Sequence, residues 1–166
     1  MNNYHIYEEE AKGKYSVIFK ARKKKKIEFV AIKRLEKTRK AKVYNEAKIL
    51  SELNHPNIIK FYDFMETKNH MWEITEYCPG GDLLKIVEYD KQLPENTVRG
   101  FILEVMAGLQ YAHSKGIIAC DIKPACVLVN EYGSVKLGDF GSAQKLVDLM
   151  GKAKTKKKGT PSYMAP

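Results

Sequence analysis

The sequence predicts an α+β fold in two lobes, the first rich in strands and the second helical. Three observations predict it. Runs of β-branched and apolar residues separated by short turns occupy the chain as far as Tyr77. Apolar residues at helical spacing follow from Asp82 onward. Between them, Pro79-Gly80-Gly81 interrupts both patterns, so we expect the first lobe and its connection to cover residues 1–78 and the second lobe residues 79–166.

Composition limits the class of protein. The 166 residues are 44% hydrophobic, enough for one sizeable core or two small lobes. No apolar run approaches the roughly 20 residues of a membrane span, and the first residues lack the pattern of a signal peptide. The three cysteines are an odd number without metal-ligand spacing, which is typical of a reducing compartment. We therefore expect a cytoplasmic protein with no membrane partner.

The net charge of +9 is concentrated in Lys20–Lys26, Lys33–Lys42 and Lys152–Lys158. Such runs can bind nucleic acid, acidic proteins or anionic lipid, or they can be solvated surface. No aromatic residues alternate with the lysines to offer bases a stacking surface. We therefore favour solvated surface and expect no nucleic-acid partner.

In the first lobe, Tyr15–Arg22 and Ile27–Leu35 are predicted strands joined by a lysine turn. The small-residue loop from Ala11 to Ser16 precedes them, and such a loop lets backbone approach a phosphate closely. A full glycine-rich loop would have glycine at 11, 13 and 16, and this chain has only Gly13. An ordinary hairpin turn explains the loop equally well.

Strand alternation gives Lys33 the same direction as its apolar neighbours Ala31 and Leu35, so it is predicted to be half-buried and to need an anion nearby. A predicted helix over 39–54 supplies one, because Glu46 shares its inward face with Val43 and Ala47. We therefore predict a Lys33–Glu46 ion pair. Such a pair is costly if purely structural, and is understandable if Lys33 is presented to a phosphate.

Two more strands, 58–65 and 71–77, complete the predicted first lobe, and two helices begin the second. The helices cover residues 82–87 and 94 to about 114. Gly116 ends the longer helix, and its apolar positions fall on one face. These positions are Val98, Phe101, Ile102, Val105, Leu109 and Ala112.

Near the end of the chain, a hairpin is predicted from Val127–Val129 and Val135–Leu137 around an Asn-Gly turn. The loop entering it carries Asp121 and Lys123, and the loop leaving it carries Asp139. Two carboxylates and a lysine around one point suit magnesium and phosphate chemistry. Taken alone, a hairpin with solvated acidic ends is an equally good interpretation.

Together these motifs resemble the eukaryotic protein kinase domain, and most closely the Fused and Runkel-like branch of Ser/Thr kinases in the ULK group. Several ordered motifs are more specific than any one of them. The matching segments are Val30-Ala31-Ile32-Lys33, Glu46, His55-Pro56-Asn57-Ile58, Glu76 to Leu83, Asp121-Ile122-Lys123-Pro124, Asp139-Phe140-Gly141 and Gly159 to Pro166. The resemblance implies a bilobal kinase fold, with a partial helical lobe over 79–166 that contains the catalytic loop and activation segment.

The resemblance also implies roles for these residues around ATP and Mg²⁺. Lys33, oriented by Glu46, would hold the α- and β-phosphates. Asp121 would accept the proton of the substrate hydroxyl, Lys123 would steady the γ-phosphate, and Asp139 would bind magnesium. The remaining nucleotide-binding positions are Ala11, Gly13, Ser16, Ile18, Ala31, Thr75, Glu76, Cys78, Asp82 and Leu128.

The chain also departs from the family pattern. Ala119-Cys120 stands where the family has His-Arg, and Cys126 stands where it has an asparagine that binds the second magnesium. A thiol is a soft ligand and suits magnesium poorly, so a second metal ligand is doubtful. Because the sequence ends at Pro166, we also expect the helix over 94–114 to expose apolar surface.

These departures leave two functions open. One is an ATP-dependent Ser/Thr protein kinase whose phosphoryl transfer to a protein substrate is weak or lost. The other is a pseudokinase that keeps the nucleotide cleft and serves as a scaffold or allosteric partner.

Glu73 fits neither function directly. Alternation puts it on the face of Thr75, one step deeper than the residue expected to guard the back of the pocket. A carboxylate there must be hydrogen-bonded, paired or protonated. Either a twist of the strand lets it reach water, or it competes with Glu46 for Lys33 and favours an outward helix.

Overall fold

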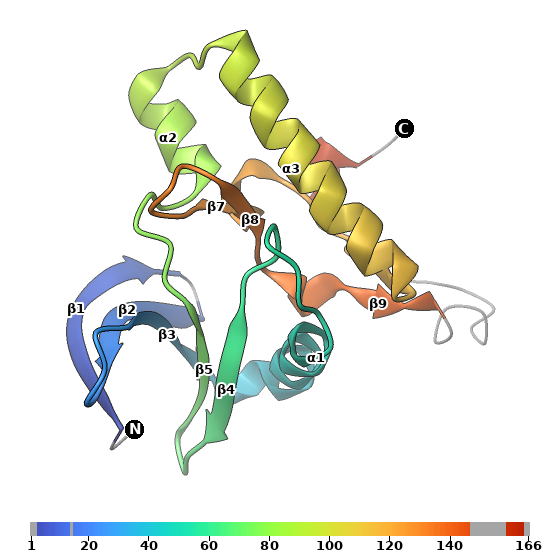
Figure 1. Cartoon of the computed structure of the whole chain (residues 1–166). Coiled ribbons are helices and arrows are strands. Elements are labelled where there is room, and N and C mark those ends of the chain that lie inside the picture. The colour runs from blue at the N-terminus through green and yellow to red at the C-terminus, as the bar shows by residue number, and fades with distance from the viewer. Residues whose placement is uncertain (1–2, 14, 147–158, 165–166) are drawn as a thin grey trace.

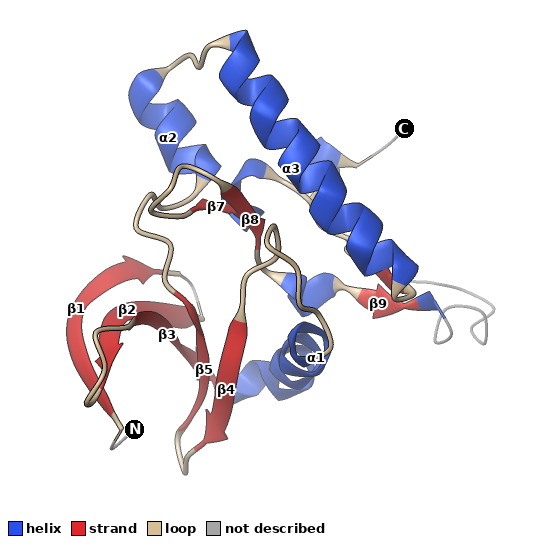
Figure 2. Cartoon of the chain, viewed as in Figure 1, coloured by secondary structure: helices blue, strands red, loops and turns tan. Residues whose placement is uncertain are grey.

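The computed structural model describes residues 3–13, 15–146 and 159–164, so the Lys152–Lys158 run lies outside the described residues. In the described part, an antiparallel sheet forms the first lobe and packs against one helix, while two further helices and a small hairpin form the second (Figures 1 and 2). The fold is therefore bilobal, as the sequence predicts.

The sheet of the first lobe has the strand order β1-β2-β3-β5-β4. Its side chains Ala21, Val30, Ile32 and Ile74 are buried together on the face away from Lys33, as alternation predicts. The helix α1 covers the other side of the lobe, where Leu35, Val43 and Met71 pack together. The bounds are β1 Tyr4–Lys12, β2 Ser16–Lys23, β3 Phe29–Glu36, α1 Lys40–Ser51, β4 Phe61–Glu66 and β5 His70–Glu76.

Three elements of this lobe differ from the prediction. The edge strand β1 was not predicted, because most of its side chains are exposed and no alternation marks it. The helix is shorter than 39–54 at both ends. β4 begins at Phe61 rather than at residue 58, because Ile58 and Ile59 pair with the hairpin of the second lobe instead, the Ile59 N–H donating to Leu137 O at 2.8 Å.

In the second lobe, Asp82 caps α2 by accepting a hydrogen bond from the Lys85 N–H at 3.0 Å. Gly116 ends α3 with φ of +68°, a conformation that favours glycine. The hairpin β7–β8 lies between α3 and the first lobe (Figure 1). The bounds are α2 Leu83–Asp90, α3 Glu95–Ser114, β6 Ile117–Ile118, β7 Val127–Val129, β8 Val135–Leu137 and β9 Gln144–Lys145.

The long helix α3 uses only part of its predicted apolar face. Ala112 is fully buried, and Phe101, Val105 and Leu109 pack against the core. Val98 and Ile102 were predicted on the same face but are 37% and 53% exposed. Leu103 and Met106 are also exposed, so the expected apolar surface on this helix is present. No described helix combines the length and the apolar character that crossing a membrane requires.

One apolar core joins the two lobes. It contains Leu50 from α1, Ile58 from the segment before β4, Leu137 from β8 and Phe140 from the turn that follows. Full burial of such side chains stabilises a fold by about 1.5–3 kcal/mol each. The lobes are therefore fixed relative to each other through the side chains that lie directly behind the cleft.

Candidate active site

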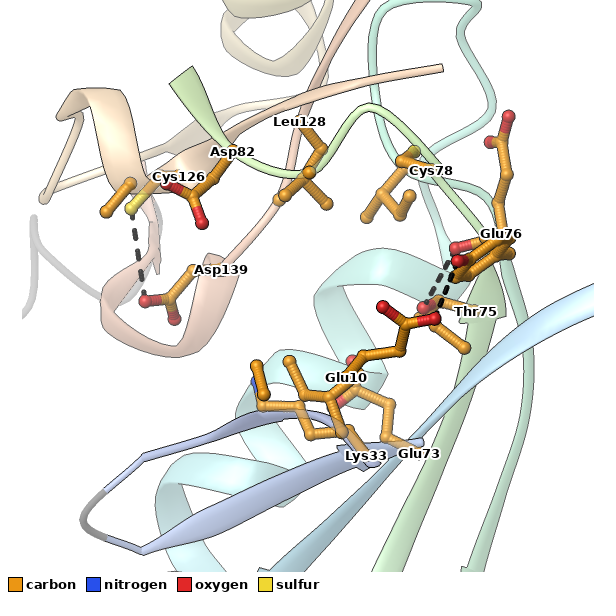
Figure 3. A pocket seen from close by; sticks show the side chains of 18 of the residues that line it. Glu10, Lys33, Glu73, Thr75, Glu76, Cys78, Asp82, Cys126, Leu128 and Asp139 are labelled. Atoms are coloured by element: carbon orange, nitrogen blue, oxygen red, sulfur yellow. Dashed lines mark hydrogen bonds between the residues drawn. The ribbon is translucent and has the colours of Figure 1, made fainter. Parts of the chain in front are cut away.

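A cavity of about 320 Å³ opens between the lobes, bounded by the sheet, the segment after β5 and the β7–β8 hairpin (Figure 3). Most of the predicted nucleotide-binding residues line it. These are Ala11, Ile18, Ala31, Lys33, Thr75, Glu76, Cys78, Asp82, Leu128 and Asp139, together with Glu46. Residues that are far apart in the sequence are thus gathered around one volume.

Two of the predicted nucleotide-binding residues lie elsewhere. Gly13 is in the β1–β2 turn, where its N–H donates to Ser16 O at 2.8 Å, and it lines no described cavity. Ser16 lines an adjoining hollow together with Lys33, Glu46 and Asp139. A contact between this turn and phosphate therefore stays a prediction.

The sequence reasoning also missed cavity residues. Glu10 lies on the unpredicted strand β1, and its carboxylate accepts a hydrogen bond from the Tyr77 hydroxyl at 2.8 Å. Gly138 and Lys85 line the cavity as well. A prediction of β1 would have found Glu10, because β1 pairs with β2 along the edge of the cavity.

The predicted Lys33–Glu46 ion pair is formed. Lys33 Nζ lies 3.3 Å from Glu46 Oε1 and 3.5 Å from Oε2. The Glu46 side chain is almost fully buried, whereas that of Lys33 is 24% exposed. Burial alone would lower the pKa of Lys33, but Glu46, Glu73 and Asp139 outweigh burial and raise it above its usual range. Lys33 is therefore held as a cation at the cavity.

Close packing of α1 against the turn after Asp139 keeps this pair in place. A Cβ on Gly141 would lie 2.4 Å from Lys42 Cε and 3.0 Å from Glu46 Oε2, so a larger residue there would displace these side chains. Asn45 Nδ2 donates to Ala143 O at 2.9 Å on the same side. Phe140 is buried in the shared core, and these contacts fix Glu46 relative to Asp139.

Asp139 adopts a left-handed backbone conformation, with φ of +51° and ψ of +62°. Few residues other than glycine adopt this conformation, and asparagine and aspartate do so most readily because their short side chains can hydrogen-bond locally. Asp139 lines the cavity across from Lys33 (Figure 3). The conformation directs a carboxylate into the cavity at a point where the backbone leaves the hairpin.

A second lysine–carboxylate pair lies beside the cavity. Lys123 Nζ donates to Asp121 Oδ2 at 2.9 Å and to Thr160 Oγ1 at 2.8 Å. The backbone N–H and the hydroxyl of Thr160 donate to Asp121 Oδ1 at 2.9 and 2.7 Å. Burial alone would raise the pKa of Asp121, but hydrogen bonds from Thr160 and Lys123 lower it overall. Asp121 is therefore an oriented, ionised carboxylate.

The thiol of Cys126 connects the two acidic loops. Its Sγ lies 3.4 Å from Asp121 O and 3.9 Å from Asp139 Oδ2, the latter drawn as a dashed line in Figure 3. The loops of Asp121 and Asp139 are thus adjacent, as the hairpin predicts. Burial, with Asp139 nearby, raises the pKa of Cys126 to about 12, so the thiol stays protonated.

The carboxylate of Glu73 is buried, with 2% of the residue exposed, so the interpretation that it reaches water is wrong. Lys33 pairs with Glu46, so the structure does not have the outward helix of the second interpretation. Glu73 Oε2 has no hydrogen-bond partner among the described residues. Burial, followed by Glu46, raises the pKa of Glu73 to about 7.

Asp139 alone fits a magnesium ion well among the groups at this end of the cavity. It offers hard carboxylate oxygens, while the protonated sulfur of Cys126 does not suit Mg²⁺. Magnesium usually combines one or two protein carboxylates with substrate phosphates and water. The residues therefore fit one magnesium ion at Asp139 and fit a second one poorly.

The fold and the cleft define a class of protein. A model of the protein kinase domain matches residues 4–166, so the chain belongs to the protein kinase domain family.

Named relatives agree with this class. The chain is similar to the serine/threonine-protein kinase RUNKEL of Arabidopsis thaliana, with 51% identity over 166 residues, 100% of this chain and 12% of that protein. It is also similar to ULK4 of Mus musculus, with 37% identity over 84% of this chain and 11% of ULK4. Human ULK1 is 38% identical over 93% of this chain and 16% of ULK1. The expected branch, Runkel-like within the ULK group, is confirmed, and the chain spans only a small part of these relatives' length.

Proposed function

We propose that the chain is an ATP-binding Ser/Thr protein kinase domain with degraded catalytic motifs, in which phosphoryl transfer to protein is weak or lost. The observation that carries this proposal is the Lys33–Glu46 ion pair, with 3.3 Å between Lys33 Nζ and Glu46 Oε1, and Asp139 lining the same cavity. A lysine held as a cation and facing a carboxylate across a cavity is the arrangement that binds phosphates and their magnesium ion.

At one end of the cavity, the adenine ring would lie between Ala31 and Leu128, with backbone groups of Glu76 and Cys78 as hydrogen-bond partners. Thr75 would close the back of this volume, and Asp82 would lie near the ribose. Burial raises the pKa of the Cys78 thiol to about 12, so it would be neutral and inert beside the base.

At the other end, Asp121 would accept the proton of a substrate Ser or Thr hydroxyl, because hydrogen bonds from Lys123 and Thr160 fix both of its oxygens. Lys123 and Lys33 would hold phosphate oxygens. Bound magnesium would neutralise phosphate charge at Asp139. Cys126 offers little to a second ion, which is the physical reason to expect weak transfer.

A second candidate function is a pseudokinase that binds nucleotide and acts as a scaffold or allosteric partner of another cytoplasmic protein. The contact between the protonated Cys126 thiol and Asp139 favours it, because that contact stands where a hard oxygen ligand would be needed. In both functions the nucleotide cleft is kept.

Calorimetric titration with ATP, with and without magnesium, tests the shared part of the proposal. We expect saturable binding in both conditions, because the adenine volume and Lys33 do not depend on Cys126. Transfer of labelled phosphate to a generic Ser/Thr substrate, compared with Asp121→Ala, then separates the two functions. Absence of nucleotide binding in every condition would contradict both.

A further inference from the structure

Glu73 places an extra carboxylate at the phosphate end of the cavity. It lies on β5 directly across from Lys33 on β3, in the antiparallel register of the two strands. It is buried, it lines the cavity, and its Oε2 has no hydrogen-bond partner within the described part of the chain. A buried carboxylate without a full set of partners is costly, so a structural role alone does not explain it.

The charges around Glu73 do not balance. It faces Lys33 from β3, Glu46 from α1 and Asp139 from the turn after β8, while Phe64 lies opposite on β4. Lys33 is the cation in this group, and its Nζ already bonds both oxygens of Glu46. When all three carboxylates are ionised, these four side chains have a net charge of −2, and Lys42, whose side chain lies beside Gly141 together with Glu46, offsets part of it. Ionised Glu73 adds one negative charge that repels an entering phosphate.

We propose that Glu73 is a specificity-determining residue that selects against phosphate charge, so that the site favours the uncharged nucleoside over ATP when magnesium is absent. This inference rests on the proposed nucleotide site. The adenine end of the cavity, with Ala31, Cys78 and Leu128, is separated from Glu73 by Thr75, so the base and ribose are affected little. The pKa of about 7 means that the selection grows as the pH rises from 6 to 8.

The test compares adenosine and ATP on the chain and on Glu73→Gln, a change that keeps the shape and removes the charge. Affinities are measured by calorimetry at pH 8 with EDTA. We expect Glu73→Gln to tighten ATP binding on the order of tenfold, as loss of one unit charge near the phosphates would do. Adenosine affinity should change by less than about twofold, and the gain for ATP should shrink at pH 6.

The matched control is Glu36→Gln, the same chemical change on an exposed residue at the far end of β3. It should leave the ratio of ATP to adenosine affinity within about twofold of the unmodified chain, because exposed charges are screened. Glu73→Leu is a second variant that also removes the charge, and it should tighten ATP in the same direction. Thermal unfolding of each variant checks that it is folded.

Three outcomes overturn the inference. Equal changes for adenosine and ATP in Glu73→Gln would show that Glu73 affects the whole pocket rather than phosphate charge. Unchanged or weaker ATP binding in both Glu73 variants would show that Glu73 does not repel phosphate. If adenosine and ATP bind to neither the unmodified chain nor the variants, the proposed function itself fails. Adenosine separates this failure from a failure of the Glu73 inference alone, because adenosine carries no phosphate and should bind wherever the nucleotide site exists.

Discussion

The two lysine–carboxylate pairs of the cleft are built in different ways. Lys33–Glu46 joins the sheet to α1, and Lys123–Asp121 joins the loop before the β7–β8 hairpin to Thr160. In the first pair, the cation of Lys33 interacts electrostatically with three carboxylates, those of Glu46, Glu73 and Asp139. In the second pair Asp121 receives hydrogen bonds from a lysine, a hydroxyl and a backbone N–H. The two pairs therefore belong to separate networks, so the nucleotide binding and the phosphoryl transfer proposed above could be weakened separately.

Replacing the lysine of each pair with methionine should give the largest difference between the pairs, in the free energy of unfolding. Lys33→Met leaves Glu46 and Glu73 buried without their cation, so we expect a loss of about 3 kcal/mol in the free energy of unfolding and loss of ATP binding. Lys123→Met should cost about 1 kcal/mol, because Thr160 still donates to Asp121. Denaturant unfolding of both variants measures the two values.

Equal costs for Lys33→Met and Lys123→Met would contradict the comparison. Normal ATP binding by Lys33→Met would contradict the role proposed for that lysine. Denaturant unfolding should be measured at pH 7, where Lys33 and Lys123 are charged because both pKa values lie above their usual range.

The second difference is in the dependence of stability on pH. The Glu73 pKa is about 7 in the folded chain against 4.5 ordinarily, so between these values the folded state holds a proton that the unfolded state has lost. The contribution of Glu73 to stability should therefore be most favourable at low pH and fall as pH rises from 4.5 to 7, by roughly 3 kcal/mol for a shift of this size.

Subtracting the pH profile of Glu73→Gln isolates this contribution. Glu46, Lys33 and Asp139 face Glu73, and they remain in the variant. We expect the difference between the two profiles to decline from pH 4.5 to 7 and to be level above pH 8. A difference that is constant with pH would mean that Glu73 is ionised throughout the range.

The Lys33–Glu46 pair could be predicted from the sequence better than the burial of Glu73 or the hydrogen bonds of the Lys123–Asp121 pair. Alternation in β3 and the helical spacing of Glu46 depend on local periodicity, so the ion pair followed from them. Alternation in β5 also predicted that the Glu73 side chain points inward. It could not show that Glu73 would be buried, because burial there depends on β4 and α1, which are packed on it in three dimensions.

The hydrogen bonds of Thr160 to Asp121 could not be predicted, because they join residues on separate loops with no local pattern. The edge strand β1 was missed for the opposite reason. Its backbone pairs with β2, but its exposed glutamates carry no hydrophobic periodicity. In this chain, local periodicity predicted the elements, and contacts between distant loops set the details of the cleft.

The third prediction concerns phosphoryl transfer. Cys126→Asn replaces a soft, protonated thiol with a hard oxygen beside Asp139, so it should improve neutralisation of charge on the transferred phosphoryl group. We expect the rate of phosphate transfer to rise by about tenfold or more, which is roughly 1.4 kcal/mol in the activation barrier. ATP affinity without magnesium should be unchanged, since the sheet end of the cleft is untouched.

Asp121→Ala is the reference for absent chemistry, both alone and combined with Cys126→Asn. If the unmodified chain transfers phosphate no faster than Asp121→Ala, and Cys126→Asn restores nothing, the pseudokinase function is favoured. If Cys126→Asn gains activity that Asp121→Ala removes, the catalytic function is favoured, with Cys126 as its weak point.

The smallest effect should come from Thr160→Val, which removes the hydroxyl that donates to Asp121 Oδ1 and accepts from Lys123. The backbone N–H of Thr160 still donates to Asp121, so we expect a loss of about 1 kcal/mol at pH 7 and no change in ATP affinity. Because the hydroxyl also helps to lower the pKa of Asp121, the pKa should rise toward its ordinary value in the variant.

A carboxylate with a lowered pKa contributes stability above its unfolded pKa and loses it as pH falls through the folded pKa. The stability lost by Thr160→Val should therefore be larger at pH 7 than at a pH low enough to protonate Asp121 in both chains. Thr38→Val is the matched control, because the Thr38 hydroxyl donates to the exposed carboxylate of Glu36 at 3.3 Å. It should cost less than about 0.5 kcal/mol at either pH. A cost for Thr160→Val that equals the control would mean that Lys123 and the backbone N–H of Thr160 are sufficient to hold Asp121.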